Sequence, residues 1–212
     1  AYLQDVVWTK DDSPYLITGD VTISSGRSLT IKEGVKVIFL ANSDDTEGGE
    51  EKYDSELLVE GSISVLGTAA EPVTFTSSET APTKGDWGGI KHNQTGIFEY
   101  AILEYSGYGI YPQADLTVKN SKIRYSGTYG IRGGSLGGRT ILIEDSEITG
   151  VQSNAIELRD GYSNSSATIK RNKISNSNGG SINLQWWGEL VFEGNEVKDN
   201  EGASFNHNYF YG

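Results

Sequence analysis

The stretches NSKIRYSGTYGIRGG, which begins at Asn120, and DSEITGVQSNAIELRD, which begins at Asp145, are copies of one pattern. Further copies are RNKISNSNGGSINLQ from Arg171 and GNEVKDNEGASFNHN from Gly194, and YAILEYSGYGIYPQ from Tyr100 is a fainter one. The copies supply two apolar series, Leu103, Ile123, Ile148, Ile174 and Val197, and Ile110, Ile131, Ile156, Ile182 and Phe205. Both series advance in steps of 20 to 26 residues, which indicates stacked supersecondary units.

Short segments of alternating apolar and polar residues recur within each unit, for example Leu116-Thr117-Val118, and Gly, Asn, Ser and Asp separate them. Such alternation is typical of short strands with one buried face. Three strands in each unit predict an all-β fold, a parallel β-helix of roughly six to eight coils that stack about 4.8 Å apart. We expect one domain over residues 1–212, with an irregular cap and first coils in 1–95 and regular coils of 20 to 26 residues in 96–212.

Polar residues precede the first apolar anchor of four copies. These residues are Asn120, Asp145, Asn172 and Asn195. Because Asn and Asp form turns and bond to nearby backbone groups, we expect these four to stack at one corner of the coils as a structural ladder.

The N-terminal part has its own strand-like segments, SPYLITGDVTISSGRSLTIKEGVKVIF from Ser13, ELLVEGSISVLGTAAEPVTFTS from Glu56 and GDWGGI from Gly85. These segments resemble the right-handed parallel β-helix repeat proteins, and the resemblance covers essentially the whole chain. It implies right-handed coils, in agreement with the usual hand of parallel crossovers. Polysaccharide lyases, epimerases, adhesins and other surface proteins share this fold, so the resemblance predicts architecture rather than function.

The composition narrows the function classes. The chain has no Cys, which excludes disulfides and thiolate chemistry, and its formal net charge of −12 disfavours nucleic acid as a partner. No apolar run approaches the ~18 residues of a membrane span. We expect a secreted or cell-surface protein.

An acidic loop, residues 42–56, interrupts the strand pattern with seven carboxylates and one Lys. Dense carboxylates are the ligands that calcium prefers, so calcium is the candidate ion and the only cofactor that we expect. The candidate ligands are Asp44, Asp45, Glu47, Glu50, Glu51 and Asp54. The alternative is a solvated acidic loop without metal.

A polar stripe is expected on one face of the coils. If the second apolar series points inward, the residues after it point outward, namely Tyr111, Arg132, Glu157, Asn183 and Asn206. A parallel column two residues on is Gln113, Gly134, Arg159, Gln185 and Asn208, with Trp186 and Trp187 at its edge. The candidate ligand-binding residues are Tyr111, Arg132, Glu157, Arg159, Asn183, Gln185, Trp186 and Trp187.

Catalysis by this stripe would need a group that neutralises a uronate carboxylate and a base beside it. The candidates are Tyr111, Arg132, Glu157, Arg159 and His207, but we assign none of them a catalytic role because no carboxylate pair lies in register. His92 and His207 are interpreted as surface or turn residues, and Trp87 as a packing residue.

Both ends of the chain are rich in apolar residues. We expect the segment from Tyr2 to Trp8 to cover the first coil as a cap, and we see no cap after the last coil. The candidate self-association residues are Tyr2, Leu3, Val6, Val7, Trp8, Phe205, Tyr209, Phe210 and Tyr211. The first hypothesis is a non-enzymatic structural or adhesive protein that associates head to tail into filaments. The alternatives are a polysaccharide-active enzyme, of the uronate lyase or epimerase type, and a carbohydrate-binding module.

Overall fold

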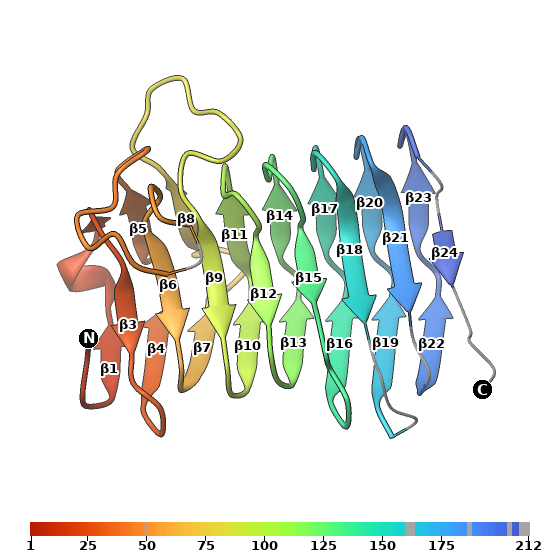
Figure 1. The fold of residues 1–212 in the computed structure, drawn as a ribbon, viewed down its shortest axis with the longest axis horizontal. Helices are drawn as coiled ribbons and strands as arrows, with labels where there is room; N and C mark the ends of the chain where they lie inside the picture. The colour runs from red at the N-terminus through yellow and green to blue at the C-terminus, as the bar shows by residue number, and fades with distance from the viewer. Residues whose placement is uncertain (50, 160–163, 186–187, 203–204, 208–212) are drawn as a thin grey trace.

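The chain folds into a straight column of stacked coils with three parallel β-sheets as its sides (Figure 1). The computed structural model describes residues 1–49, 51–159, 164–185, 188–202 and 205–207. Each sheet has eight strands, so the right-handed parallel β-helix predicted from the repeats is confirmed, with about eight coils and three strands per coil. Among the described residues, no helix has the length and apolar character that crossing a membrane requires.

Every coil contributes one strand to each sheet. Sheet I contains β1 (Val6–Trp8), β4 (Ser28–Lys32), β7 (Ser62–Leu66), β10 (Gly96–Glu99), β13 (Leu116–Lys119), β16 (Thr140–Glu144), β19 (Ser166–Lys170) and β22 (Glu189–Glu193). Sheet II contains β2 (Tyr15–Ile17), β5 (Lys36–Phe39), β8 (Val73–Ser77), β11 (Ala101–Glu104), β14 (Lys122–Arg124), β17 (Glu147–Thr149), β20 (Lys173–Ser175) and β23 (Glu196–Lys198). Sheet III contains β3 (Val21–Ile23), β6 (Glu56–Val59), β9 (Gly89–His92), β12 (Ile110–Pro112), β15 (Ile131–Gly133), β18 (Asn154–Arg159), β21 (Gly180–Gln185) and β24 (Phe205–His207). A 3₁₀ turn, η1 (Lys10–Asp12), lies between β1 and β2.

The apolar series form continuous columns inside the coils. The register pairs Ile110 with Ile131, Ile131 with Ile156, Ile156 with Ile182 and Ile182 with Phe205, as the repeats predicted. The four isoleucines are at most 1% exposed. Because each buried aliphatic side chain contributes about 2 kcal/mol, these columns are the main source of stability.

In the coils from β10 onward, a single residue at positive φ turns the chain from sheet I toward sheet II, whereas longer segments connect these sheets in the first three coils. The residues at this corner have positive φ between 49° and 64°, and they are Tyr100, Asn120, Asp145, Arg171 and Gly194. The ladder that we expected here is therefore wrong by one residue in two coils: Asn120 and Asp145 share a column with Arg171, at the turn. Asp145 follows Asn120 by 25 residues, and Arg171 follows Asp145 by 26. Because these two coils differ in length by one residue, the sequence alone concealed the shift.

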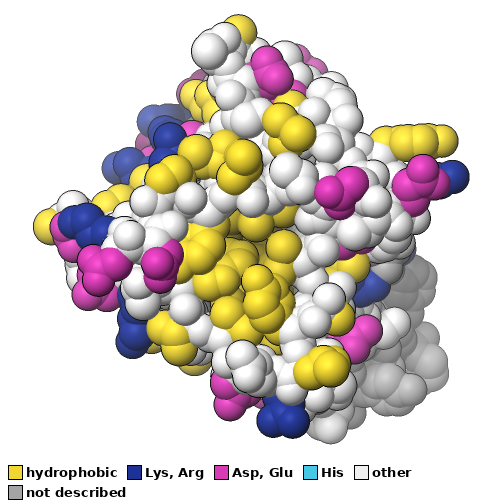
Figure 2. Space-filling view, turned by 90° about the vertical axis from the view of Figure 1, so that its left-hand side faces the viewer, with side chains coloured by type: hydrophobic (Ala, Val, Ile, Leu, Met, Phe, Trp, Pro, Cys, Tyr) yellow, Lys and Arg dark blue, Asp and Glu magenta, His cyan; other side chains and the backbone are white. Residues whose placement is uncertain are grey.

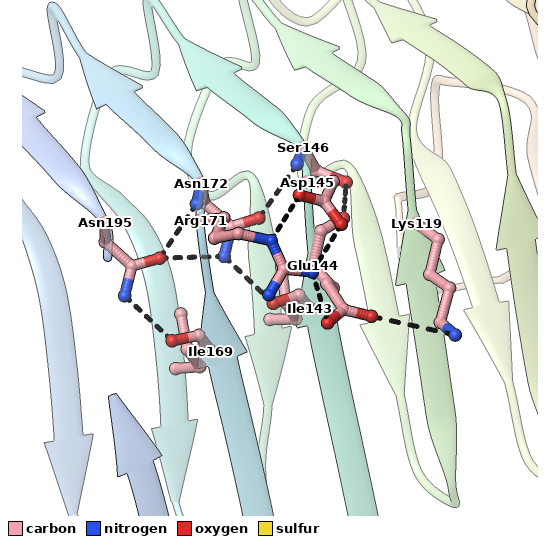
Figure 3. A network of polar contacts seen from close by, with 9 residues as sticks. All are labelled: Lys119, Ile143, Glu144, Asp145, Ser146, Ile169, Arg171, Asn172 and Asn195. Atoms are coloured by element: carbon pink, nitrogen blue, oxygen red, sulfur yellow. Dashed lines mark hydrogen bonds and ion pairs between the residues drawn. The ribbon is translucent and has the colours of Figure 1, made fainter. Parts of the chain in front are cut away.

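The stacked polar ladder lies one residue further on, at Ser121, Ser146, Asn172 and Asn195, and Figure 3 shows the last three of these residues. The Asn172 amide accepts a bond from the Ser146 N–H at 3.0 Å and donates to the Ile143 carbonyl at 2.9 Å. Asn195 likewise donates to the Ile169 carbonyl at 2.8 Å. The ladder therefore pairs backbone groups that the sharp corner would leave unsatisfied.

Outside this corner, Arg171 bridges two coils through charge-assisted bonds (Figure 3). Its guanidinium donates twice to Asp145, both times at 2.7 Å, and once to Glu144 at 2.6 Å. The hydrogen bonds from Arg171 hold the pKa of Asp145 below its ordinary value. Since this network is exposed, it adds little stability but fixes the geometry of the corner.

The N-terminal segment covers the first coil only in part: Tyr2 pairs with Ile23 at the edge of β3, but the residues after it form a strand of the coil itself. Val6–Trp8 is strand β1, and Trp8, only 4% exposed, stacks on Tyr15 with ring centroids 4.8 Å apart. Trp8 is therefore part of the core, and its assignment to a self-association surface is wrong. A strand formed because the alternation at 6–8 matches that at 29–31, with which it pairs.

The first coil consequently leaves apolar surface uncovered at the N-terminal end of the column, where polar groups surround it (Figure 2). Half-buried Val6, Tyr15 and Val21 pack against the core in this coil, whereas core residues of the next coils are fully buried. At the other end, Leu190 and Val197 are half-buried, and Phe192 and Phe205 are exposed with rings 4.8 Å apart.

The rings of Trp87 and His92 are both buried, which confirms one prediction from the sequence and contradicts another. Trp87 is a packing residue as predicted: it is fully buried, stacks on Phe39 at 4.0 Å and donates from Nε1 to the Glu104 carbonyl at 2.9 Å. The interpretation of His92 as a surface residue is wrong. Its ring lies in the core next to Val59 of the preceding coil, because the G-I-K-H strand places alternate residues inward.

Candidate ligand-binding face of sheet III

The outer face of sheet III carries the polar stripe predicted from the repeats. The register pairs Arg132 with Glu157, Glu157 with Asn183 and Asn183 with Asn206. Arg159 pairs with Gln185 in the next outward column. The column of Arg132 continues toward the N-terminal end with Tyr111, Lys91 and Leu58, which also pair in register.

Glu157 anchors the two arginines of this face. Its side chain points outward but is almost completely covered, and the residue is 3% exposed. The Arg159 Nη2 lies 3.0 Å from Oε1, the Arg132 Nε 3.6 Å from the same oxygen, and the Asn154 amide donates to Oε2 at 2.9 Å. Both arginine side chains remain nearly half-exposed. Glu157, which we expected to contact ligand, is thus a positioning residue for two cations.

Tyrosine rings flank these cations. The Arg132 guanidinium carbon lies 4.9 Å from the centre of the Tyr129 ring and 5.6 Å from that of Tyr111. The Lys91 ammonium lies 5.6 Å from the Tyr111 ring centre. Within this range a cation is attracted to the face of an aromatic ring, so the rings and charges hold one another in place.

A second buried carboxylate supports the aromatic part of the face. Glu56, fully buried at the start of β6, accepts a hydrogen bond from the Tyr108 hydroxyl. The Tyr108 ring lies against Gly89, where an added Cβ atom would come within 2.6 Å of two ring carbons. Gly89, at φ +148°, is therefore required for this ring position.

Two hollows open on the face. One, of about 170 Å³, is lined by Glu51, Tyr108, Tyr111, Thr128, Tyr129 and Arg132. The other, of about 220 Å³, is lined by Gly49, Leu58, Val59, Glu60, Lys91 and Asn93. The face therefore offers cations, flat rings and concave surface within three or four adjacent coils.

Several predicted site residues are not brought to these hollows. His207 pairs with Leu184 and lies three strands from Arg132, about 14 Å away at ordinary strand spacing, so the two do not act on one substrate atom. Asn183 is half-buried in the arginine column. Trp186, Trp187, Tyr209, Phe210 and Tyr211 lie outside the described residues.

Three contributors to the face escaped the sequence analysis, namely Lys91, Tyr108 and Tyr129. A signal for the tyrosines was present, because the tripeptide Tyr-Gly-Ile occurs at 108–110 and again at 129–131. The Gly allows the next coil to approach closely, because a Cβ atom at Gly109 or Gly130 would meet the carbonyl oxygen of Gly130 or Ala155, and the Ile fixes the register. Lys91 gave no such signal, since the strand that carries it matches the repeat only in its apolar residues.

The acidic loop, residues 42–56, is attached to the first coils by hydrogen bonds. Asp44 accepts from the Thr46 amide at 2.9 Å and from the Gly48 amide at 3.0 Å, so its oxygens are used within the loop. Burial raises the pKa of Asp20 and of Asp54 above the ordinary range. Among the described residues, no three His, Cys, Asp or Glu side chains gather as a metal site, and Glu50 is outside them. Calcium binding by this loop stays a prediction.

Comparison with known protein families agrees with the geometry of the coils. Residues 1–95 match a family model described as a pectate-lyase-like β-helix domain, and residues 106–211 match one described as a right-handed β-helix region. No curated protein and no solved structure matches the chain. The matches specify the architecture and leave the ligand to be inferred from the face itself.

Proposed function

Because the chain belongs to the right-handed β-helix family, we propose that it is an extracellular, non-enzymatic protein that binds a uronate polysaccharide on sheet III. The observation that carries this proposal is the pair of half-exposed guanidiniums that Glu157 holds beside a tyrosine-lined hollow. A guanidinium binds a carboxylate through two parallel hydrogen bonds, and a phenol ring offers a flat amphipathic surface. Uronate residues present both a carboxylate and an apolar ring face.

The two arginines are already held in position before a ligand arrives, which lowers the entropy cost of binding. Arg132 and Arg159 are both paired to one buried carboxylate, so less side-chain freedom is lost when ligand arrives. The chain as a whole repels polyanions with its net charge of −12. Screening limits that repulsion to about 10 Å at 0.1 M salt, and the local cations then dominate.

Arg132→Ala and Arg159→Ala are each expected to weaken binding of polygalacturonate about 10-fold, the effect of one charge-assisted hydrogen bond. Calorimetric titration with polygalacturonate measures the Kd, and neutral amylose is the control polymer. Arg139→Ala is the matched control because Arg139 precedes β16 on sheet I and is exposed. Equal losses in all three variants would refute the assigned site.

Incubation of the protein with polygalacturonate, followed by analysis of the polymer, separates binding from catalysis. Unsaturated uronate products would replace the proposal with a lyase that uses Arg132 and Tyr111, whereas retention of intact polymer supports a binding module. No retention of polygalacturonate by the wild-type chain, at any salt concentration, would overturn the proposal.

A second candidate function is head-to-tail association into an adhesive or structural assembly, which the open apolar surface at the N-terminal end favours (Figure 2). In this arrangement β22 and β23 of one copy lie against β1 and β2 of the next, which continues the parallel sheets. Such a contact does not close on itself and gives filaments. The last coil carries Glu189, Glu193 and Glu196, and the first carries Asp5, Asp11 and Asp12, so the two ends repel each other at low salt.

Sedimentation of the chain over a range of concentrations is expected to show a mass that rises with protein and with salt. Val21→Lys should give monomers, because Val21 points into the half-covered core of the first coil. Val7→Lys is the control, since Val7 is 55% exposed on the outer side of β1. A constant monomer mass in every condition would exclude the assembly.

A further inference from the structure

We propose that the acidic loop is a built-in competitor for the cationic face of sheet III, an inference that rests on the glycan-binding function proposed above. The loop carries seven carboxylates and one Lys, whereas the face beside it carries Lys91 and Arg132. The loop therefore has the charge of the polymer that the face is proposed to bind.

The first leg of the loop is fastened to the segment between β2 and β3. The Thr18 hydroxyl donates to Asp45 at 3.1 Å, and the Asp45 amide donates to the Thr18 carbonyl at 3.3 Å. The Asp20 amide donates to the Thr46 hydroxyl at 3.2 Å. These bonds direct the chain from sheet II toward sheet III rather than into solvent.

The returning leg is fastened to the site itself. The Glu51 amide donates to the buried carboxylate of Glu56 at 3.1 Å, and the same carboxylate accepts the Tyr108 hydroxyl. The Glu56 amide in turn donates to Asp20 at 2.9 Å. Because Tyr108 lines the smaller hollow, the loop and the aromatic wall share one anchor.

Both hollows are bordered by the loop. Gly49 lines the hollow that contains Lys91, and Glu51 lines the hollow that contains Tyr111 and Arg132. Glu51 is exposed and lines the same hollow as Arg132, the cation that a uronate carboxylate would contact. A tethered group acts at an effective concentration near the millimolar range, so it raises the apparent Kd of a competing polymer.

Calorimetric titration of the full chain with polygalacturonate tests the competition. Glu51→Gln is expected to lower the Kd about two- to fivefold, as for an exposed ion pair, and to have no effect when Arg132 is already Ala. Glu47→Gln is the control with the same charge change, because Glu47 pairs with Lys52 at 3.6 Å and borders neither hollow.

The outcomes separate the two proposals. If the wild type binds and Glu51→Gln leaves the Kd unchanged, or if both glutamine variants tighten binding equally, the competitor is refuted and the binding function stands. If Glu51→Gln binds polygalacturonate more tightly than the wild type and Glu47→Gln does not, the competitor is supported. If no variant binds polygalacturonate, the binding function is refuted and the competitor with it.

Discussion

Acidification from pH 7 to pH 4 is expected to lower the free energy of unfolding by about 3 kcal/mol through His92 alone. Burial lowers the pKa of His92 to about 4 from an ordinary value of 6.5. The folded chain therefore resists the proton that the unfolded chain accepts. The free energy of unfolding that depends on neutral His92 is fully present above pH 6.5 and is lost as the pH falls toward 4. Urea unfolding at stepped pH values measures this loss.

His92→Asn isolates this effect. The His92 Nδ1 lies 2.7 Å from the Gln94 carbonyl, so an asparagine amide can occupy a similar position without titrating between pH 4 and 7. The wild type and the variant have the same carboxylates, including Asp20 and Asp54 with their raised pKa values. The effects of these carboxylates therefore cancel when the unfolding free energy of the variant is subtracted from that of the wild type. Parallel stability curves for wild type and variant would contradict the assignment to His92.

Asn172→Ala is expected to reduce the free energy of unfolding by about 2 kcal/mol, because it leaves one buried amide without its partner and removes a second hydrogen bond. The amide is that of Ser146, the second bond is the one that Asn172 donates to the Ile143 carbonyl, and Asn172 itself is 1% exposed. Denaturant unfolding gives the total, and hydrogen exchange of the Ser146 amide gives the local effect. Both are needed because stacked units need not unfold together.

Asn172→Ser is the matched control for the ladder. Ser146 occupies the same column one coil earlier, where its hydroxyl accepts from the Ser121 amide at 3.1 Å. A serine at 172 should therefore retain part of the bonding and lose roughly 1 kcal/mol. If the alanine and serine variants are equally stable, the side chain of Asn172 does not satisfy the corner.

The fold could be predicted from the sequence because one apolar column is enough to determine the register of a coil. The series through Ile131 and Ile156 placed Arg132 beside Glu157 without structural information. The polar corner was harder to align. Both Asp145 and Asn172 are residues that form turns, and nothing in their chemistry distinguishes the turning residue from the inward one after it.

The candidate site was predicted only in part, because its chemistry depends on burial. Alternation predicted that Glu157 points outward, but only the arginines that cover it make it a buried anchor. Similarly, β9 in GDWGGIKH is a strand whose inward His92 replaces an aliphatic residue. Contacts between coils decided both cases, and a single-strand pattern contains no information about them.

The turn from sheet I to sheet II has a consequence for how such a protein can change its size. In the coils from β10 onward one residue at positive φ marks this turn, and every strand bonds only to the coils directly before and after it. Duplication of a whole coil, such as residues 145–170, would therefore insert a rung whose edges fit its neighbours. Evolution can lengthen the column in this way without disturbing the hollows, which lie in earlier coils.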